Sequence, residues 1–130
     1  MSDKTIAERL EVKRERRLVL LYAPEELDEI IGVPDHRAGL EVADVVVLVA
    51  MDRAALTTKL PTLLASARPS AILWIAYPKL SSPLASDLDR ETIRSIASSS
   101  GMKIVSQIAL SSDWSAMRLG RNQLTAGLRR

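Results

Sequence analysis

Apolar runs of strand length recur along this chain, separated by segments whose apolar residues recur every three or four positions. Three runs are almost continuous, which is typical of strands buried on both faces of a parallel sheet. They are Leu18–Tyr22, Ala43–Ala50 and Ala71–Tyr77. Two later segments, Lys103–Leu110 and Trp114–Leu119, flank a polar turn. We predict that they pair as an antiparallel hairpin.

The segments between the apolar runs carry helix signals. Pro24 is a favourable first-turn residue, and Asp52 is a predicted N-cap for a second helix. Pro61 lies inside that second helix and is expected to kink or restart it. A third helix is expected to be capped by Ser86 or Asp89. Helices therefore alternate with strands along most of the chain.

This alternation predicts an α/β fold. We expect a Rossmann-like three-layer sandwich with a mostly parallel sheet, Ala71–Tyr77 as its middle strand, and a C-terminal antiparallel hairpin. Residues 17–121 are expected to form this single domain. Residues 1–16 are expected to form a loosely attached helical or flexible segment, and residues 122–130 a basic tail.

Composition narrows the class of protein. The chain has 130 residues, a net charge of +2, no Cys and only one His. Disulfides, thiol catalysis and zinc–thiolate sites are excluded, and no ligand spacing for a metal is found. No apolar run approaches the ~20 residues of a membrane span, and the charged N-terminus does not resemble a signal peptide. We therefore expect a cytoplasmic protein.

The turn after the first strand is informative for what it lacks. Dinucleotide and S-adenosylmethionine binders usually have a glycine-rich loop here, because only glycine lets the backbone approach the ligand closely. This chain has Tyr22-Ala23-Pro24-Glu25-Glu26 instead. Side chains fill the approach, and two carboxylates would repel a phosphate. No cofactor is predicted.

The loops that follow the later strands carry the candidate site. Ligands of open α/β sheets bind at the carboxyl ends of the strands. The candidate ligand-binding residues at that edge are Lys79, Asp87, Asp113, Trp114 and Arg118. The four charged residues suit general acid–base chemistry, or else an ion-pair network that closes one loop onto another, and we favour the network. Trp114 is expected to be partly exposed, lining a pocket or a subunit contact, or else to pack across the base of the hairpin.

Nucleophilic catalysis has weak support. Ser81, Ser82 and Ser86 lie in the loop after Ala71–Tyr77, but a serine nucleophile needs a neighbouring base. The single histidine, His36, lies on a distant connection and is expected to be solvated rather than catalytic. No G-x-S-x-G motif is found.

The sequence resembles a short bacterial family of unknown function. The motifs that carry the likeness are Leu20–Glu25, Leu73–Lys79, Ser86-Asp87-Leu88, and Asp113-Trp114-Ser115 with Arg118. Their order and spacing extend the likeness from about Leu18 to Arg118. The resemblance implies a Rossmann-like fold but does not imply any activity. Pro83 stands where the family more often has Gly or another small residue. This proline is expected to stiffen the loop.

The element order also resembles the later half of class I methyltransferases, whose sheet ends in a similar hairpin. The glycine-rich loop of those enzymes is missing here, so the resemblance implies their fold rather than their activity.

Three functions remain open. The first is a non-enzymatic Rossmann-like binding or interaction module, with a homodimer and a small anionic ligand as expected partners. The alternative is an atypical small-molecule transferase with a site at the carboxyl edge of the sheet. The third is nucleic-acid contact through the basic C-terminus, which is disfavoured because no aromatic residues are interleaved with the arginines.

Overall fold

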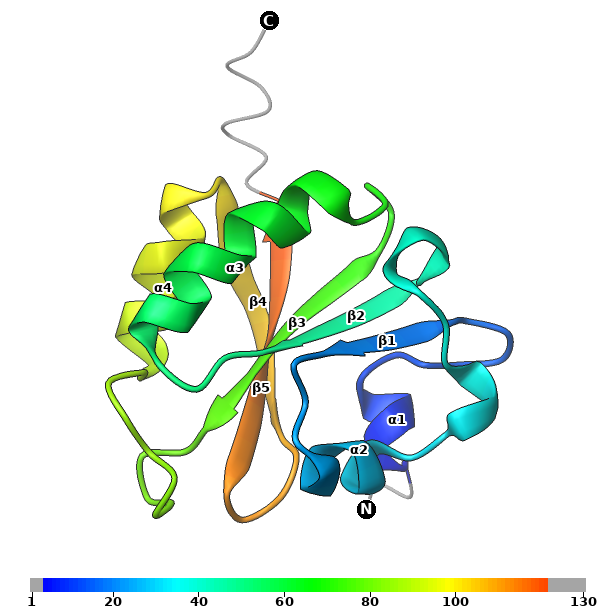
Figure 1. The fold of residues 1–130 in the computed structure, drawn as a ribbon, viewed down its shortest axis with the longest axis horizontal. Helices are drawn as coiled ribbons and strands as arrows, with labels where there is room; N and C mark the ends of the chain where they lie inside the picture. The colour runs from blue at the N-terminus through cyan, green and yellow to red at the C-terminus, as the bar shows by residue number, and fades with distance from the viewer. Residues whose placement is uncertain (1–3, 122–130) are drawn as a thin grey trace, which may run out of the picture.

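The structure is a computed structural model, and it describes residues 4–121. A five-stranded sheet forms its centre, in the order β1-β2-β3-β5-β4 (Figure 1). The strands are β1 (Leu18–Leu21), β2 (Val45–Val49), β3 (Ile72–Pro78), β4 (Met102–Ala109) and β5 (Trp114–Arg121). The α/β class, the C-terminal hairpin and the central position of β3 are confirmed.

The sheet is mixed, which corrects the expectation of a mostly parallel one. β1, β2 and β3 form two parallel pairs, and β5 pairs antiparallel with both β3 and β4. The last strand of the described residues, β5, lies inside the sheet because it inserts between β3 and β4. β4 is left at the edge, which accounts for its many exposed residues.

Helices cover both faces of this sheet. The helices are α1 (Ile6–Arg9), α2 (Glu25–Ile31), α3 (Arg53–Ser66) and α4 (Arg90–Ser99), and short 3₁₀ turns span Pro34–His36 and Leu40–Val42. α3 and α4 share one apolar core with the sheet, and α1 and α2 share the other. Figure 1 shows the two helix pairs on opposite sides of the strands. This is the expected three-layer arrangement.

The structure confirms most of the helix ends predicted from the sequence. Asp52 caps α3 by accepting a hydrogen bond from the Ala55 N–H at 2.8 Å. Asp89, not Ser86, caps α4 through the Thr92 N–H, also at 2.8 Å. α3 runs as one helix through Pro61, so the proline does not end it.

The N-terminal segment packs on the sheet rather than attaching loosely. Ala7, Leu10 and Val12 are buried, and Leu10 is fully inaccessible. The indole Nε1 of Trp74, at the centre of β3, donates a hydrogen bond of 2.9 Å to the Leu10 carbonyl. Apolar burial and a buried hydrogen bond therefore hold residues 7–12 against the domain. The basic tail, residues 122–130, lies outside the described residues.

Candidate functional site

At the carboxyl edge of the parallel strands, two successive helices leave toward opposite faces of the sheet. α2, which follows β1, and α3, which follows β2, lie on opposite faces. In open α/β sheets the crevice between two such strands is where ligands bind.

Tyr22 occupies the turn between β1 and α2 at this edge. Its backbone has φ of 64°, in the left-handed region that favours glycine. Its side chain is 64% exposed, and the Lys59 Nζ from α3 lies 3.8 Å from the ring centroid. The turn therefore has the backbone shape that a glycine would adopt, but an aromatic ring and an ammonium group occupy it.

Glu26, in the first turn of α2, also takes part in the packing at this edge. One of its carboxylate oxygens accepts a hydrogen bond of 3.2 Å from the Trp114 indole Nε1. Trp114 is only 1% exposed and belongs to the same core as α2. The expectation that Trp114 is partly exposed is wrong: the indole is buried between the hairpin and α2, and its polar end reaches a carboxylate.

A pocket of about 300 Å³ lies beside the end of β3. Its lining comes from β3 and the loop after it, from the start of α4, and from the β4–β5 hairpin. The lining residues are Tyr77, Lys79, Leu80, Ser81, Asp89, Arg90, Gln107 and Ser115. Lys79 is the one candidate ligand-binding residue of the sequence that lines it. We call this the Lys79 pocket.

A hydrogen-bond network forms the inner part of the Lys79 pocket. The Gln107 Nε2 donates to the Tyr77 hydroxyl oxygen at 3.1 Å and to the Ser115 Oγ at 3.0 Å. Ser115 in turn donates to the Ile108 carbonyl at 3.1 Å. Burial raises the pKa of Tyr77 above its ordinary 10.0, so its phenol is protonated at neutral pH.

Asp113 is close to Lys79, but through backbone. The Lys79 N–H donates a hydrogen bond of 2.8 Å to the Asp113 carbonyl, which fixes the β3 loop against the hairpin turn. The Asp113 side chain does not line the Lys79 pocket.

Asp87 lies elsewhere along the same edge. One of its carboxylate oxygens accepts from the Arg53 N–H, the first of α3, at 2.8 Å. The neighbouring Ser86 hydroxyl donates to the Met51 carbonyl. These two side chains hold the β3–α4 loop against the β2–α3 turn. That role replaces the helix cap expected of Ser86.

Arg118 is not at this edge. It pairs in register with Trp74 in the middle of the sheet. Its side chain lines a hollow of about 220 Å³ at the opposite end of the strands, beside Ser70 and Arg121. Within residues 4–121 no ion pair joins Lys79, Asp87, Asp113 and Arg118. The expected four-residue network does not form.

Arg90 and Gln107 line the Lys79 pocket and were not predicted from the sequence. Arg90 directly follows the cap residue of α4, and a more exact placement of that helix start would have drawn attention to it. Gln107 lies on an edge strand among exposed residues, and no local pattern distinguishes it.

Residues 4–121 contain no group of three or more His, Cys, Asp or Glu side chains able to hold a metal ion. Their helices include none long and apolar enough to cross a bilayer. The ring of His36 lies against the Arg16 carbonyl, with Nδ1 at 2.9 Å, away from the Lys79 pocket.

Solved structures with similar folds include methyltransferases, one of them in complex with S-adenosylmethionine. Mitomycin 7-O-methyltransferase MmcR matches with a TM-score of 0.54 and 12% identity, over 82% of this chain and 42% of that one. The O-methyltransferase NcsB1 from neocarzinostatin biosynthesis, in complex with S-adenosylmethionine and a naphthoic acid, gives 0.52 and 12%, over 82% and 41%. A protein of the NADB-Rossmann superfamily from Streptococcus agalactiae gives 0.55 and 7%, over 93% and 69%.

These likenesses confirm a Rossmann-like fold related to that of methyltransferases, and at such identities they show the fold alone. The chain spans less than half the length of either methyltransferase. No curated protein sequence matches the chain. A family model described as "Protein of unknown function (DUF3052)" matches residues 25–123, and the chain therefore belongs to this family, as its motifs indicated.

Proposed function

We propose that this protein is a non-enzymatic binding module that holds a small organic anion in the Lys79 pocket. The observation that carries the proposal is the pairing of two cations, Lys79 and Arg90, with the Tyr77–Gln107–Ser115 network in one pocket. The cations supply charge, and the network supplies fixed polar groups that orient a ligand.

The charge balance of the pocket favours an anion. The only carboxylate in the lining is Asp89, and it already accepts the Thr92 N–H as the cap of α4. Lys79 and Arg90 have no ion-pair partner within residues 4–121. An anionic ligand would supply the missing counter-charge.

The size and the apolar part of the lining limit the ligand. A volume of about 300 Å³ lies at the small end of ligand pockets, which span roughly 300–1,000 Å³. Leu80, 63% exposed, provides an apolar wall. A compact carboxylate or phosphate with a small apolar body fits this combination.

The arrangement does not favour catalysis. The lining contains two serines, and a serine nucleophile needs an adjacent base. Ser115 donates its hydroxyl proton to a backbone carbonyl, and His36 is not in the lining.

The fold supports one alternative, an atypical small-molecule transferase. Two solved structures with a similar fold are methyltransferases, and one of them, NcsB1, is in complex with S-adenosylmethionine. Tyr22 occupies the turn after β1, where such a cofactor would approach, and Lys59 from α3 packs on its ring, which is why we rank this alternative second.

A thermal-shift screen separates the two functions. The full chain is screened against small carboxylates, phosphates, nucleotides and S-adenosylmethionine, because a ligand that binds only the folded state raises the melting temperature. The module proposal predicts stabilisation by a small anion that is lost in Lys79→Ala and Arg90→Ala. Arg94→Ala is the matched control, since Arg94 lies on the same helix but pairs with Glu91 in solvent. Stabilisation by S-adenosylmethionine alone, unchanged in both pocket variants, would instead support the transferase.

A further inference from the structure

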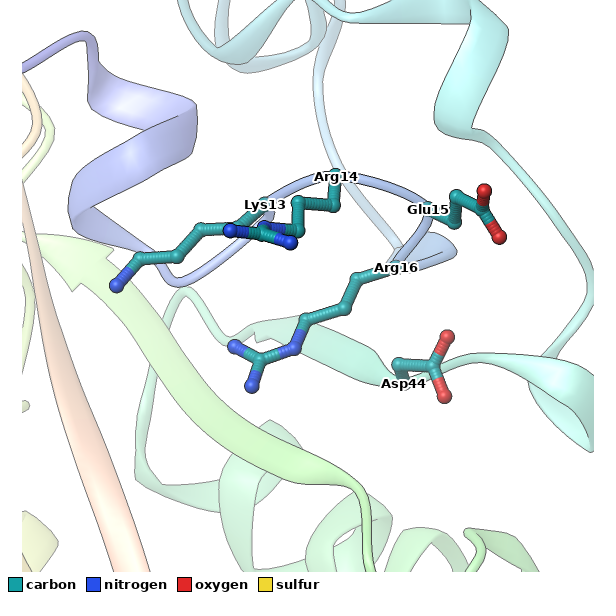
Figure 2. A pocket seen from close by; sticks show the side chains of 5 residues that line it. All are labelled: Lys13, Arg14, Glu15, Arg16 and Asp44. Carbon is teal, nitrogen blue, oxygen red and sulfur yellow. The ribbon is translucent and has the colours of Figure 1, made fainter.

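Another hollow, of about 580 Å³, lies at the opposite end of the sheet from the Lys79 pocket, where the parallel strands begin. It is lined by Lys13, Arg14, Glu15 and Arg16, which precede β1, and by Asp44, which precedes β2. Figure 2 shows the side chains around it. We propose that Lys13, Arg14 and Arg16 bind the phosphate groups of a small di- or polyphosphate ligand in this hollow.

The positively and negatively charged side chains lie on different sides of the hollow (Figure 2). In Figure 2 the ammonium group of Lys13 and the guanidinium groups of Arg14 and Arg16 lie toward one side, while the carboxylates of Glu15 and Asp44 point to the other. A ligand with concentrated negative charge would meet three cations on one side without approaching either carboxylate.

The carboxylates nearby do not neutralise these cations. A Glu11 carboxylate oxygen lies 3.2 Å from the Lys13 Nζ and 3.7 Å from an Arg16 nitrogen. One negative charge is therefore shared between two positive charges. Asp44 is already occupied: it pairs with Arg68 at 3.1 Å and accepts the Arg17 N–H at 2.8 Å. Positive charge is therefore in excess on the cationic side.

Arg14 provides the free group. It is exposed and has no ion pair or hydrogen bond from its side chain within residues 4–121. Its neighbour Arg16 is oriented by a hydrogen bond of 2.9 Å to the Glu11 carbonyl. One fixed guanidinium and one free guanidinium thus lie beside the same hollow.

The space extends beyond one phosphate group. A neighbouring hollow of about 540 Å³ shares Lys13 and Arg14 with the hollow of about 580 Å³, and it is also lined by Val33 and His36. Guanidinium groups bind phosphate oxygens through two parallel hydrogen bonds, and two of them with an ammonium group suit a dianionic phosphate better than a single carboxylate. A chain of two or more phosphates would use cations that both hollows share.

The test uses the full chain at low ionic strength, with inorganic pyrophosphate as the probe and backbone amide chemical shifts as the readout. The proposal predicts shifts centred on residues 13–16. Arg14→Gly removes the guanidinium, and it suits the backbone φ of 53° at this position, so the variant is expected to fold. It should weaken pyrophosphate binding about tenfold, with partial recovery in Arg14→Lys, because Lys keeps the charge but not the planar pair of donors.

Controls separate a site from general charge attraction. Arg94→Ala removes one positive charge on α4, on the face of the sheet away from α1, and should leave pyrophosphate affinity unchanged. Equal losses in Arg14→Gly and Arg94→Ala would overturn the proposal, as would pyrophosphate shifts that avoid residues 13–16. A short DNA oligonucleotide forms the last comparison: if it binds these residues and pyrophosphate does not, the small-ligand proposal is wrong.

Discussion

The ammonium group of Lys59 lies 3.8 Å from the centre of the Tyr22 ring. The tyrosine belongs to the turn after β1 and the lysine to α3, so the pair joins the β1–α2 turn to the helix that follows β2. Nucleotide-binding Rossmann folds usually have a glycine-rich loop after the first strand, and in this chain the Tyr22 ring and the Lys59 ammonium group lie there instead. The backbone of Tyr22 in this turn is left-handed, the conformation that favours glycine.

The stability of Tyr22 variants tests this description of the turn. Tyr22→Ala should destabilise the protein by about 0.5–1 kcal/mol, because it removes an exposed cation–π contact and keeps the unfavourable φ. Tyr22→Gly removes the same contact but relieves the backbone, so it should be more stable than the alanine variant by about 1 kcal/mol. Urea unfolding measures both. Equal stability of the two variants would show that the turn is not strained.

The attachment of the N-terminal segment is tested at Leu10. Leu10→Ala should cost about 2–5 kcal/mol of unfolding free energy, the usual range for a fully buried leucine. Trp74→Phe should cost about 1–3 kcal/mol, because it leaves the buried Leu10 carbonyl without its donor. Arg9→Ala, in the exposed part of α1, is the control and should change stability by no more than about 0.5 kcal/mol. A change as small as this in Leu10→Ala would mean that the segment is detachable after all.

Asp87 is predicted to stabilise the fold rather than bind ligand. Asp87→Ala should cost about 1 kcal/mol, because it removes the acceptor of the first N–H of α3. Asp87→Asn retains an acceptor oxygen and should recover part of that loss. In the thermal-shift screen, the stabilisation produced by a small anion should be the same in Asp87→Ala as in the unmodified chain. A ligand-induced shift that disappears in Asp87→Ala would return this residue to the binding site.

Asp89 gives a prediction for acid pH. Hydrogen bonds from Thr92 lower the pKa of the Asp89 carboxyl below its ordinary 3.8. A folded-state pKa below the unfolded value means that the charged cap stabilises the fold above pH 3.8, and that this contribution is lost as the pH falls through the folded-state pKa. The melting temperature of Asp89→Asn should therefore lie below that of the unmodified chain at neutral pH, and the gap should narrow in acid. A gap that stays constant down to the acid limit would contradict this assignment.

The fold was predictable because burial dictates the pattern of each strand. β2 and β3 are buried along almost their whole length, and their apolar runs are correspondingly continuous. The insertion of β5 between β3 and β4 was not predictable from local patterns, because the alternation of apolar residues in β4 is only partial, broken at Ser106, and does not distinguish an edge strand from an inner one. Strand order depends on tertiary packing, which neighbouring residues in the sequence do not specify.

The candidate site was predicted only in part, for a similar reason. Lys79 follows a buried strand that ends in proline, so its position at the carboxyl edge follows from topology. Arg118 was misplaced because β5 runs antiparallel to β3. The strand starts at the carboxyl edge of the parallel strands and runs away from it, so Arg118, its fifth residue, lies far from that edge. Trp114 was misplaced because its partner, Glu26, lies 88 residues away in the chain.

The measurement that tests the central claim most directly is a chemical-shift map of the full chain with the small anion that stabilises it most in the screen. The binding-module account predicts the largest amide shifts at Lys79, Leu80, Arg90 and Gln107, and their loss in Lys79→Ala and Arg90→Ala but not in Arg94→Ala. Shifts centred on Tyr22–Glu26, or shifts that persist in both pocket variants, would contradict it. So would a complete screen in which no small anion stabilises the protein.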